Sequence, residues 1–199
     1  MKPNRLTGGE YLDSSQNELI RNTVLDFWQW AFSDLRSNDI RGVFAEWLVA
    51  KLLDIPLSVR DSWAEWDLIM ENGIKIEVKA SAYLQTWKQK QPSRIVFSGL
   101  CGRKLNAETN QYAPISTYNA DLYVFCVQIE KNTLLWNALD LNQWRFYLLT
   151  KNQLAQYKTK SISLKTLAAA ADELTADGFC QYAKIVIESI RSANISRII

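Results

Sequence analysis

The sequence predicts an α/β protein in which a mixed β-sheet is flanked by helices. Hydrophobic residues make up 48% of the 199 residues and aromatic residues 12%, which supports a sizeable core and argues against disorder. Apolar and polar residues alternate over 66–79, as in paired strands, whereas 41–53 and 177–192 have apolar residues at helical spacing. A mostly apolar run at 121–129 predicts a central strand.

The remaining elements follow from the same patterns. We expect further helices over about 17–36, near 150 and from Ser163, and further strands at 57–60, 94–98, 134–138 and 145–149. Residues 99–119 have no helical period and are predicted to form a long loop, so the topology there stays open. Without an internal repeat or linker, the chain is predicted to be a single domain over 1–199, with a core of about 38–130 and additions at both ends.

Residues 66–79 are predicted to form a β-hairpin that turns at Asn72-Gly73. Two turn lengths are conceivable. A two-residue turn would place Glu71 opposite Ile74 and would mix polar with apolar residues in each cross-strand pair. A three-residue turn, with the glycine in the left-handed conformation, places Met70 opposite Ile74 instead.

We prefer the three-residue turn because it gives the hairpin one apolar face, and a shift of one residue would move every side chain to the other face. In this register Asp67 lies opposite Glu77, and Lys79 projects on the same side. The apolar face carries the remaining pairs, Met70 with Ile74, Leu68 with Ile76 and Trp66 with Val78.

The facing carboxylates of Asp67 and Glu77 indicate a cation site. Two such groups repel each other unless a cation lies between them or one is protonated. Mg²⁺ suits them because it is usually held by one or two carboxylates together with waters and substrate phosphates. Lys79 could orient an attacking water or stabilise charge on a phosphate. The alternative is a solvated strand face with cross-strand ion pairs, such as Glu65 with Lys79.

A second carboxylate-bearing element lies upstream. The helix over 41–53 is apolar on nearly every side, so we expect it to be buried. Glu46 lies among its apolar positions, and a buried carboxylate without a partner is costly, so a cation or donor should lie nearby. The alternatives are a carboxylate that reaches solvent, or a salt bridge to Arg41 or Lys51.

Composition excludes several classes of enzyme. The chain has no histidine, which removes Ser-His-Asp hydrolases, Cys-His proteases and zinc hydrolases with His ligands. Three widely spaced cysteines do not suggest a disulfide framework or a zinc site. The net charge of +2 is too small to indicate nucleic-acid binding by itself. A magnesium site built from Asp, Glu and Lys remains compatible with all of this.

The arrangement of Asp67 on one strand and Glu77-x-Lys79 on the next resembles the PD-(D/E)xK nuclease superfamily, in a bacterial-type branch. Trp66 stands where the motif has proline, at a position that varies widely in the superfamily. The resemblance implies a restriction-endonuclease-like fold. The common core of that fold has a helix between the active-site strand and the next core strand, and residues 99–119 give no sign of it.

The resemblance also implies roles for individual residues. Asp67 and Glu77 would hold Mg²⁺, or Mn²⁺ in its place, together with the Val78 carbonyl, and Lys79 would be catalytic. In many of these nucleases a helix before the hairpin delivers a Glu to the metal site, and Glu46 matches that role by position.

The segment after Lys79 is a candidate for substrate binding. Ser81 continues the polar face of the strand. Gln85, Trp87 and Lys88 then mix polar, aromatic and basic side chains, which suits phosphate contact and base stacking. An ordinary solvated loop is the alternative. Many PD-(D/E)xK nucleases carry a glutamine downstream of the lysine, and either Gln85 or Gln89 could match it.

The function predicted from these features is a Mg²⁺-dependent DNA endonuclease of restriction-like type that hydrolyses phosphodiester bonds. The alternatives are a repair or junction nuclease with the same site, a non-catalytic nucleic-acid-binding protein that keeps the fold, and an RNA-directed nuclease. Cutting both strands often needs two active sites, so a homodimer on DNA is compatible with this function. Without an apolar run of membrane-spanning length or a signal-peptide core, we expect a cytoplasmic protein without membrane contact.

Overall fold

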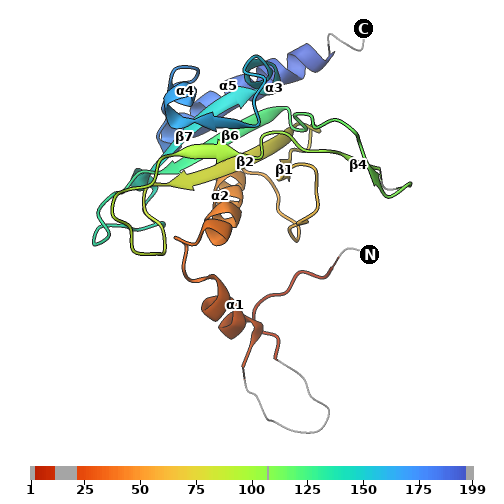
Figure 1. The fold of residues 1–199 in the computed structure, drawn as a ribbon. Coiled ribbons are helices and arrows are strands. Elements are labelled where there is room, and N and C mark those ends of the chain that lie inside the picture. The colour runs from red at the N-terminus through yellow and green to blue at the C-terminus, as the bar shows by residue number, and fades with distance from the viewer. Residues whose placement is uncertain (1–2, 12–21, 107, 196–199) are drawn as a thin grey trace.

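The centre of the fold is a four-stranded mixed sheet, seen in a computed structural model that describes residues 3–11, 22–106 and 108–195 (Figure 1). The strands lie in the order β1 (Leu68–Ile69), β2 (Lys75–Ala82), β6 (Leu122–Gln128) and β7 (Trp144–Thr150). β2 and β6 are parallel, and the other neighbouring pairs are antiparallel. The predicted α/β class with a mixed sheet is confirmed.

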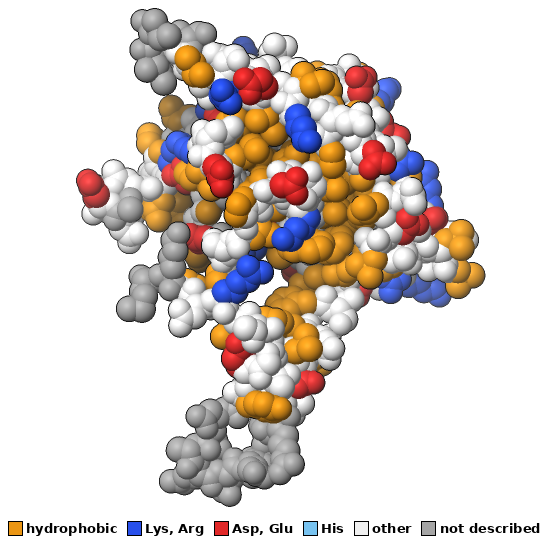
Figure 2. Space-filling model, turned by 180° about the vertical axis from the view of Figure 1, so that it is seen from behind, with side chains coloured by type: hydrophobic (Ala, Val, Ile, Leu, Met, Phe, Trp, Pro, Cys, Tyr) orange, Lys and Arg blue, Asp and Glu red, His pale blue; other side chains and the backbone are white. Residues whose placement is uncertain are grey.

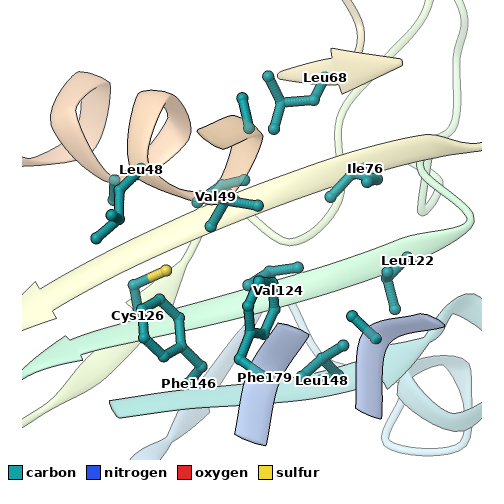
Figure 3. Packing of buried hydrophobic residues seen from close by; sticks show 14 of the residues in the cluster. Leu48, Val49, Leu68, Ile76, Leu122, Val124, Cys126, Phe146, Leu148 and Phe179 are labelled. Carbon is teal, nitrogen blue, oxygen red and sulfur yellow. The ribbon is translucent and has the colours of Figure 1, made fainter. Parts of the chain in front are cut away.

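Helices cover both faces of the sheet, as predicted. On one face, α2 (Asn38–Leu52) and α5 (Ala176–Ile195) enclose a hydrophobic core in which Val49 and Phe179 pack against the sheet (Figure 3). The other face is covered by two short helices and a two-stranded sheet, namely α3 (Lys151–Ala155), α4 (Leu164–Ala168), β3 (Val96–Ser98) and β8 (Ser161–Ser163).

The strand β2 separates apolar from charged side chains. Ile76 and Val78 lie in the core beneath α2 (Figure 3). Because side chains alternate across a strand, Glu77, Lys79 and Ser81 project from the opposite face. The neighbouring strand β6 is buried at every position, as predicted for a central strand, because it has a strand on either side and cover on both faces.

The connection from β2 to the parallel strand β6 contains no helix in its described residues. Parallel strands need a long connection, which is usually helical. Here it consists of β3 and a small hairpin of β4 (Leu105–Asn106) and β5 (Gln111–Tyr112). The region predicted as a long loop therefore holds a hairpin that no sequence pattern indicated.

Three predicted elements differ from the structure. No strand forms at 57–60 or at 134–138. In the second case Asn132 accepts hydrogen bonds from following backbone amides and turns the chain, which leaves Leu134 91% exposed. The first helix, α1 (Val24–Phe32), ends before the predicted residue 36, and the first part of the prediction, residues 17–21, lies outside the described residues.

α1 projects from the body of the protein (Figure 1). None of its residues is buried, and Trp30 is 84% exposed. The N-terminal segment fixes its start, since Glu10 O and Gly8 O accept hydrogen bonds from the first two amides of the helix, both at 2.9 Å. Gly8 has φ +94° and lies against the Trp28 ring, where a Cβ would come within 3.1 Å.

Hydrophobic side chains also gather in the middle of the face seen in Figure 2. The helix α2, which was predicted to be buried, also carries exposed hydrophobic residues on its outer side, since Val43 and Trp47 are 42% and 47% exposed. Exposed apolar area is typical of a surface that another macromolecule covers. In the part of the chain that the structure describes, no helix is both long and apolar enough to cross a membrane.

Candidate active site

The hairpin adopts the register with the three-residue turn, as predicted. Leu68 pairs with Ile76, and Met70 N donates to Ile74 O over 3.0 Å. Gly73 has φ +82°, the left-handed conformation that this turn requires. Extended by one residue, the same register sets Asp67 opposite Glu77.

Regular strand pairing begins at Leu68. At the preceding residue, Asp67, the side-chain carboxylate hydrogen-bonds to β2 in place of the backbone carbonyl. Asp67 N donates to Ile76 O over 3.1 Å, while Asp67 Oδ2 accepts a hydrogen bond of 2.7 Å from Val78 N. Amide and carbonyl of one residue point to the same side of a strand, so the Val78 carbonyl also leaves β2 on the side of Asp67. Two kinds of oxygen therefore converge at this edge of β2.

Trp66 corrects one detail of the predicted hairpin. It was expected opposite Val78 on the apolar face, but it packs against the core on the other side of the sheet. The Lys75 ammonium lies 4.0 Å from the centre of its ring. Because the Asp67 side chain occupies the Val78 amide, a continued strand cannot form there, and the alternation of side chains is broken at Asp67.

Glu77 and Lys79 form an ion pair on the face of β2 opposite α2, with 2.6 Å between Lys79 Nζ and Glu77 Oε1. The two side chains are 15% and 24% exposed, so water screens the pair only partly. The cross-strand pair considered from sequence does not form, since Glu65 pairs with Lys104 at 3.5 Å. Gly99 lies beside the ammonium, where a Cβ would make an ordinary van der Waals contact with Lys79 Nζ at 3.9 Å.

The carboxyl group of Asp67 has its pKa raised from 3.8 to about 7. Burial is the largest cause, and the charges of Glu77 and Glu46 come next. The Val78 amide and the charge of Lys79 act in the opposite direction without cancelling the effect. The ionised form of Asp67 is therefore disfavoured, because nearby positive charge does not balance it. A bound cation would supply that charge.

Glu46 is buried on α2, and its carboxylate is held by Arg60. Arg60 Nε lies 2.5 Å from Oε2, and the second guanidinium contact, to Oε1, is 2.7 Å. The alternative partners considered from sequence, Arg41 and Lys51, are not the ones used. Since α2 covers the face of the sheet opposite Glu77, Glu46 acts on Asp67 through its charge and not through a shared contact.

Sequence reasoning missed Arg60 and Gly99. A cation or donor was predicted near Glu46, but Arg60 lies in a loop without periodicity, so no local pattern could identify it. Gly99 follows β3 with φ +67°, and its nearness to Lys79 depends on the pairing of strands far apart in sequence.

Among the described residues, no three or more His, Cys, Asp or Glu side chains come close enough together to hold a metal ion. A cation between Asp67 and Glu77 would therefore take its other ligands from the Val78 carbonyl, water and substrate phosphate. A small set of hard oxygen donors of this kind, carboxylates beside a neutral carbonyl and water, fits Mg²⁺ or Mn²⁺, which keep several waters in protein sites.

The residues predicted to bind substrate fall into two groups. Ser81 lies on β2 on the face of Glu77 and Lys79. Gln85 is tied into the fold, since its Nε2 donates to Ala82 O over 2.9 Å and its Oε1 accepts from Arg41 at 3.4 and 3.5 Å. Trp87 and Lys88 are exposed in the loop beyond β2. The structure thus separates these two from the carboxylates by the second half of β2.

The chain matches no protein-family model and no curated protein sequence. Among solved structures it is similar to a bacterial homing endonuclease, I-Ssp6803I. The two share 20% sequence identity with a TM-score of 0.36, over 64% of this chain and 78% of that chain. A likeness this distant assigns no activity, so the function has to be inferred from the residues of the site.

Proposed function

We propose that this protein is a metal-dependent DNA endonuclease of the PD-(D/E)xK type that hydrolyses phosphodiester bonds with Mg²⁺, or with Mn²⁺ in its place. One observation carries the proposal: the hairpin register sets Asp67 opposite Glu77, with Lys79 two residues further on the same face. The raised pKa of Asp67 supports it, because strongly perturbed carboxyl groups concentrate at functional sites.

Each residue of the site would have its own task. Asp67, Glu77 and the Val78 carbonyl would hold the cation, which supplies Lewis-acid stabilisation of a phosphate. With Glu77 engaged, the Lys79 ammonium is released from its ion pair and can hold the attacking water or stabilise charge on the phosphate. Glu46 and Arg60 would position Asp67 through their charges.

Three other functions use the same features. A repair or junction nuclease would share the chemistry and differ in the loops that receive DNA, and an RNA-directed nuclease would differ in its substrate alone. A non-catalytic nucleic-acid-binding protein is less favoured. It would have no need for a carboxyl group such as Asp67 that is kept both buried and short of positive charge.

We further propose that the protein is cytoplasmic and acts on DNA as a homodimer. The exposed apolar side chains of α1 and of the outer side of α2 support a contact between copies. Light scattering after size-exclusion chromatography, with and without DNA, tests this. A monomer in both conditions contradicts the dimer and leaves the chemistry of the site untouched.

The test of the proposed function is calorimetric titration with Mn²⁺ beside cleavage of supercoiled plasmid. We expect wild type to bind Mn²⁺ and to nick plasmid, and Asp67→Asn to do neither. Asp61→Asn is the matched control, since Asp61 is an exposed carboxylate in the preceding loop and should behave as wild type. If wild type binds no Mn²⁺ even with a short duplex present, the proposal is wrong. Branched DNA and RNA substrates distinguish the related nucleases.

A further inference from the structure

A hollow of about 380 Å³ lies beyond the end of β2. It is formed by residues 84–92, which follow β2, and by Lys131 and Thr133, which follow β6, together with Arg36. Figure 1 shows these two loops at the same end of the sheet. The volume falls at the lower end of the range for small-molecule sites, so a single nucleotide unit is the size of group that it can take.

The lining of the hollow is cationic and contains no Asp or Glu. Its basic residues are Arg36, Lys88, Lys90 and Lys131. Lys88 and Lys90 form no ion pair in the described part of the chain. Two acids lie just outside the lining: Asp34, at 3.7 Å from Arg36, and Glu130, whose carboxylate accepts a hydrogen bond of 2.8 Å from Lys131 N. On a protein with a net charge of only +2, this is a marked local excess of positive charge.

Two of these cations are held in place by aromatic rings. The Lys131 ammonium lies 4.4 Å from the centre of the Tyr83 ring, and the Arg36 guanidinium lies 5.3 Å from the centre of the Trp136 ring. Cation–π contacts of this length restrict the side chains without neutralising their charge. The positive field of the hollow is thus partly preorganised.

The loop itself is closed by one side chain. Gln89 Oε1 accepts from Gln85 N at 2.7 Å, while Gln89 Nε2 donates to Tyr83 O and Ser93 Oγ at 3.1 and 3.0 Å. Ser93 N also donates to Tyr83 O over 2.8 Å, so the two ends of the loop meet. A loop braced in this way holds its remaining side chains in a defined position.

Trp87 is 61% exposed at the surface of this braced loop. A tryptophan that only stabilised the loop would be expected to bury its large ring. Trp87 lies in the same loop as Lys88 and Lys90, which form no ion pair among the described residues. An exposed indole beside such lysines is a combination with which proteins bind single-stranded nucleic acid, since any base can stack on the ring while lysines contact the phosphates.

We propose that this hollow binds an unpaired stretch of the DNA substrate, with a base stacked on Trp87 and phosphates at Lys88 and Lys90. The inference rests on the proposed function, because the candidate active site lies on the same strand. Leu84 is five residues beyond Lys79, and because the chain leaves the strand after Ala82, the two are at most about 17 Å apart. Nucleotides in one strand of a duplex are spaced about 3.4 Å apart, so the hollow would hold DNA within about five nucleotides of the cut.

Binding is tested by fluorescence anisotropy with a labelled oligothymidine roughly 12 nucleotides long, beside a duplex of equal length, without a divalent metal. For Lys88→Ala/Lys90→Ala, we expect the slope of log affinity against log salt for the single strand to fall by about 1.4. Lys165→Ala/Lys184→Ala is the matched control, since it removes two exposed lysines on α4 and α5 and should leave the slope unchanged. Trp87→Ala should weaken single-strand binding at least about fivefold.

The outcomes separate this inference from the proposed function. All the substituted side chains are exposed, so circular dichroism and urea unfolding should match wild type. The inference is overturned if the two double variants have the same salt slope for single-strand binding, or if Trp87→Ala binds the single strand as tightly as wild type. It is also overturned if the variants of the hollow weaken duplex binding as much as single-strand binding. Any of these results can coexist with plasmid cleavage that depends on Asp67. Loss of cleavage chemistry in wild type would instead overturn the proposed function.

Discussion

Glu46 on α2 and Arg60 in the loop before β1 form a two-point ion pair, and the charge of each acts on Asp67. This relationship explains why a buried carboxylate is tolerated next to the site. Glu46 is paired with its own arginine, whereas the Asp67–Glu77 pair has a direct ion-pair contact only from Lys79, through Glu77, among the described residues. The two carboxylates of Asp67 and Glu77 therefore carry more negative charge than the neighbouring lysine balances.

Arg60→Ala should destabilise the protein by about 1–2 kcal/mol, because it leaves the Glu46 carboxylate without its partner. Loss of one partner from a fully buried pair costs about 3–5 kcal/mol, and the figure is reduced here since the Arg60 side chain is 41% exposed. Urea unfolding measures the change. Arg191→Ala is the control, since its pair with Glu188 at 3.6 Å is exposed on both sides, and removing it should change stability by less than about 0.5 kcal/mol. Equal effects of the two substitutions would contradict this account of Glu46.

The raised pKa of Asp67 predicts that the metal-free protein loses stability as pH rises. Below 3.8 the carboxyl group is protonated in both states, and its burial carries no charge penalty. Between 3.8 and about 7 the unfolded chain releases this proton first, so the free energy of unfolding falls. Above about 7 the penalty is complete.

Asp67→Asn should therefore stabilise the metal-free protein at pH of about 8 by up to about 4 kcal/mol, the free energy that corresponds to the rise in pKa, and have little effect near pH 4. Urea unfolding in EDTA at both pH values measures this. Asp61→Asn, at an exposed position, should show no such dependence. A stabilisation that is equal at both pH values would mean that the amide acts through packing and not through the loss of a charge.

The hairpin shows which features a local sequence pattern can predict. Its register could be predicted because alternation over 66–79 and the turn at Gly73 depend on neighbouring residues alone. Glu46 was correctly predicted to be buried on its helix. In each case the deciding contact lies within a few residues or one turn of the same element.

Contacts between distant segments could not be predicted in the same way. Arg60 pairs with Glu46 from a loop without periodicity, and Phe97 on β3 pairs with Ile162 on β8, 65 residues further along the chain. The prediction for Trp66 was wrong for a different reason. The Asp67 carboxylate accepts a hydrogen bond from the Val78 amide and so interrupts a strand that alternation alone would continue. The polar chemistry that makes the site thus also breaks the pattern from which the site was predicted.

Two glycine substitutions should have opposite signs. Gly73→Ala puts a Cβ on a residue with φ +82° and should cost about 1 kcal/mol, although nothing lies within 4 Å of that Cβ. Gly42→Ala in α2 likewise meets nothing within 4 Å, and alanine is the better helix former by about 1 kcal/mol, so it should stabilise the protein. Thermal unfolding of both variants compares the two. A neutral Gly73→Ala would contradict the three-residue turn.

Lys79→Met should strongly reduce cleavage without weakening metal binding. The ammonium competes with a cation for Glu77, to which it is paired at 2.6 Å, so its removal should leave Mn²⁺ affinity equal or higher. Plasmid cleavage should fall by roughly 10²–10³, the usual effect of losing one group that stabilises charge in the transition state. Lys75→Met is the control, because Lys75 lies on the same face of β2 but its ammonium contacts the Trp66 ring instead of Glu77. Titration calorimetry and nicking rates measured on the same preparations separate the two roles, and full cleavage by a folded Lys79→Met variant would show the proposed mechanism to be wrong.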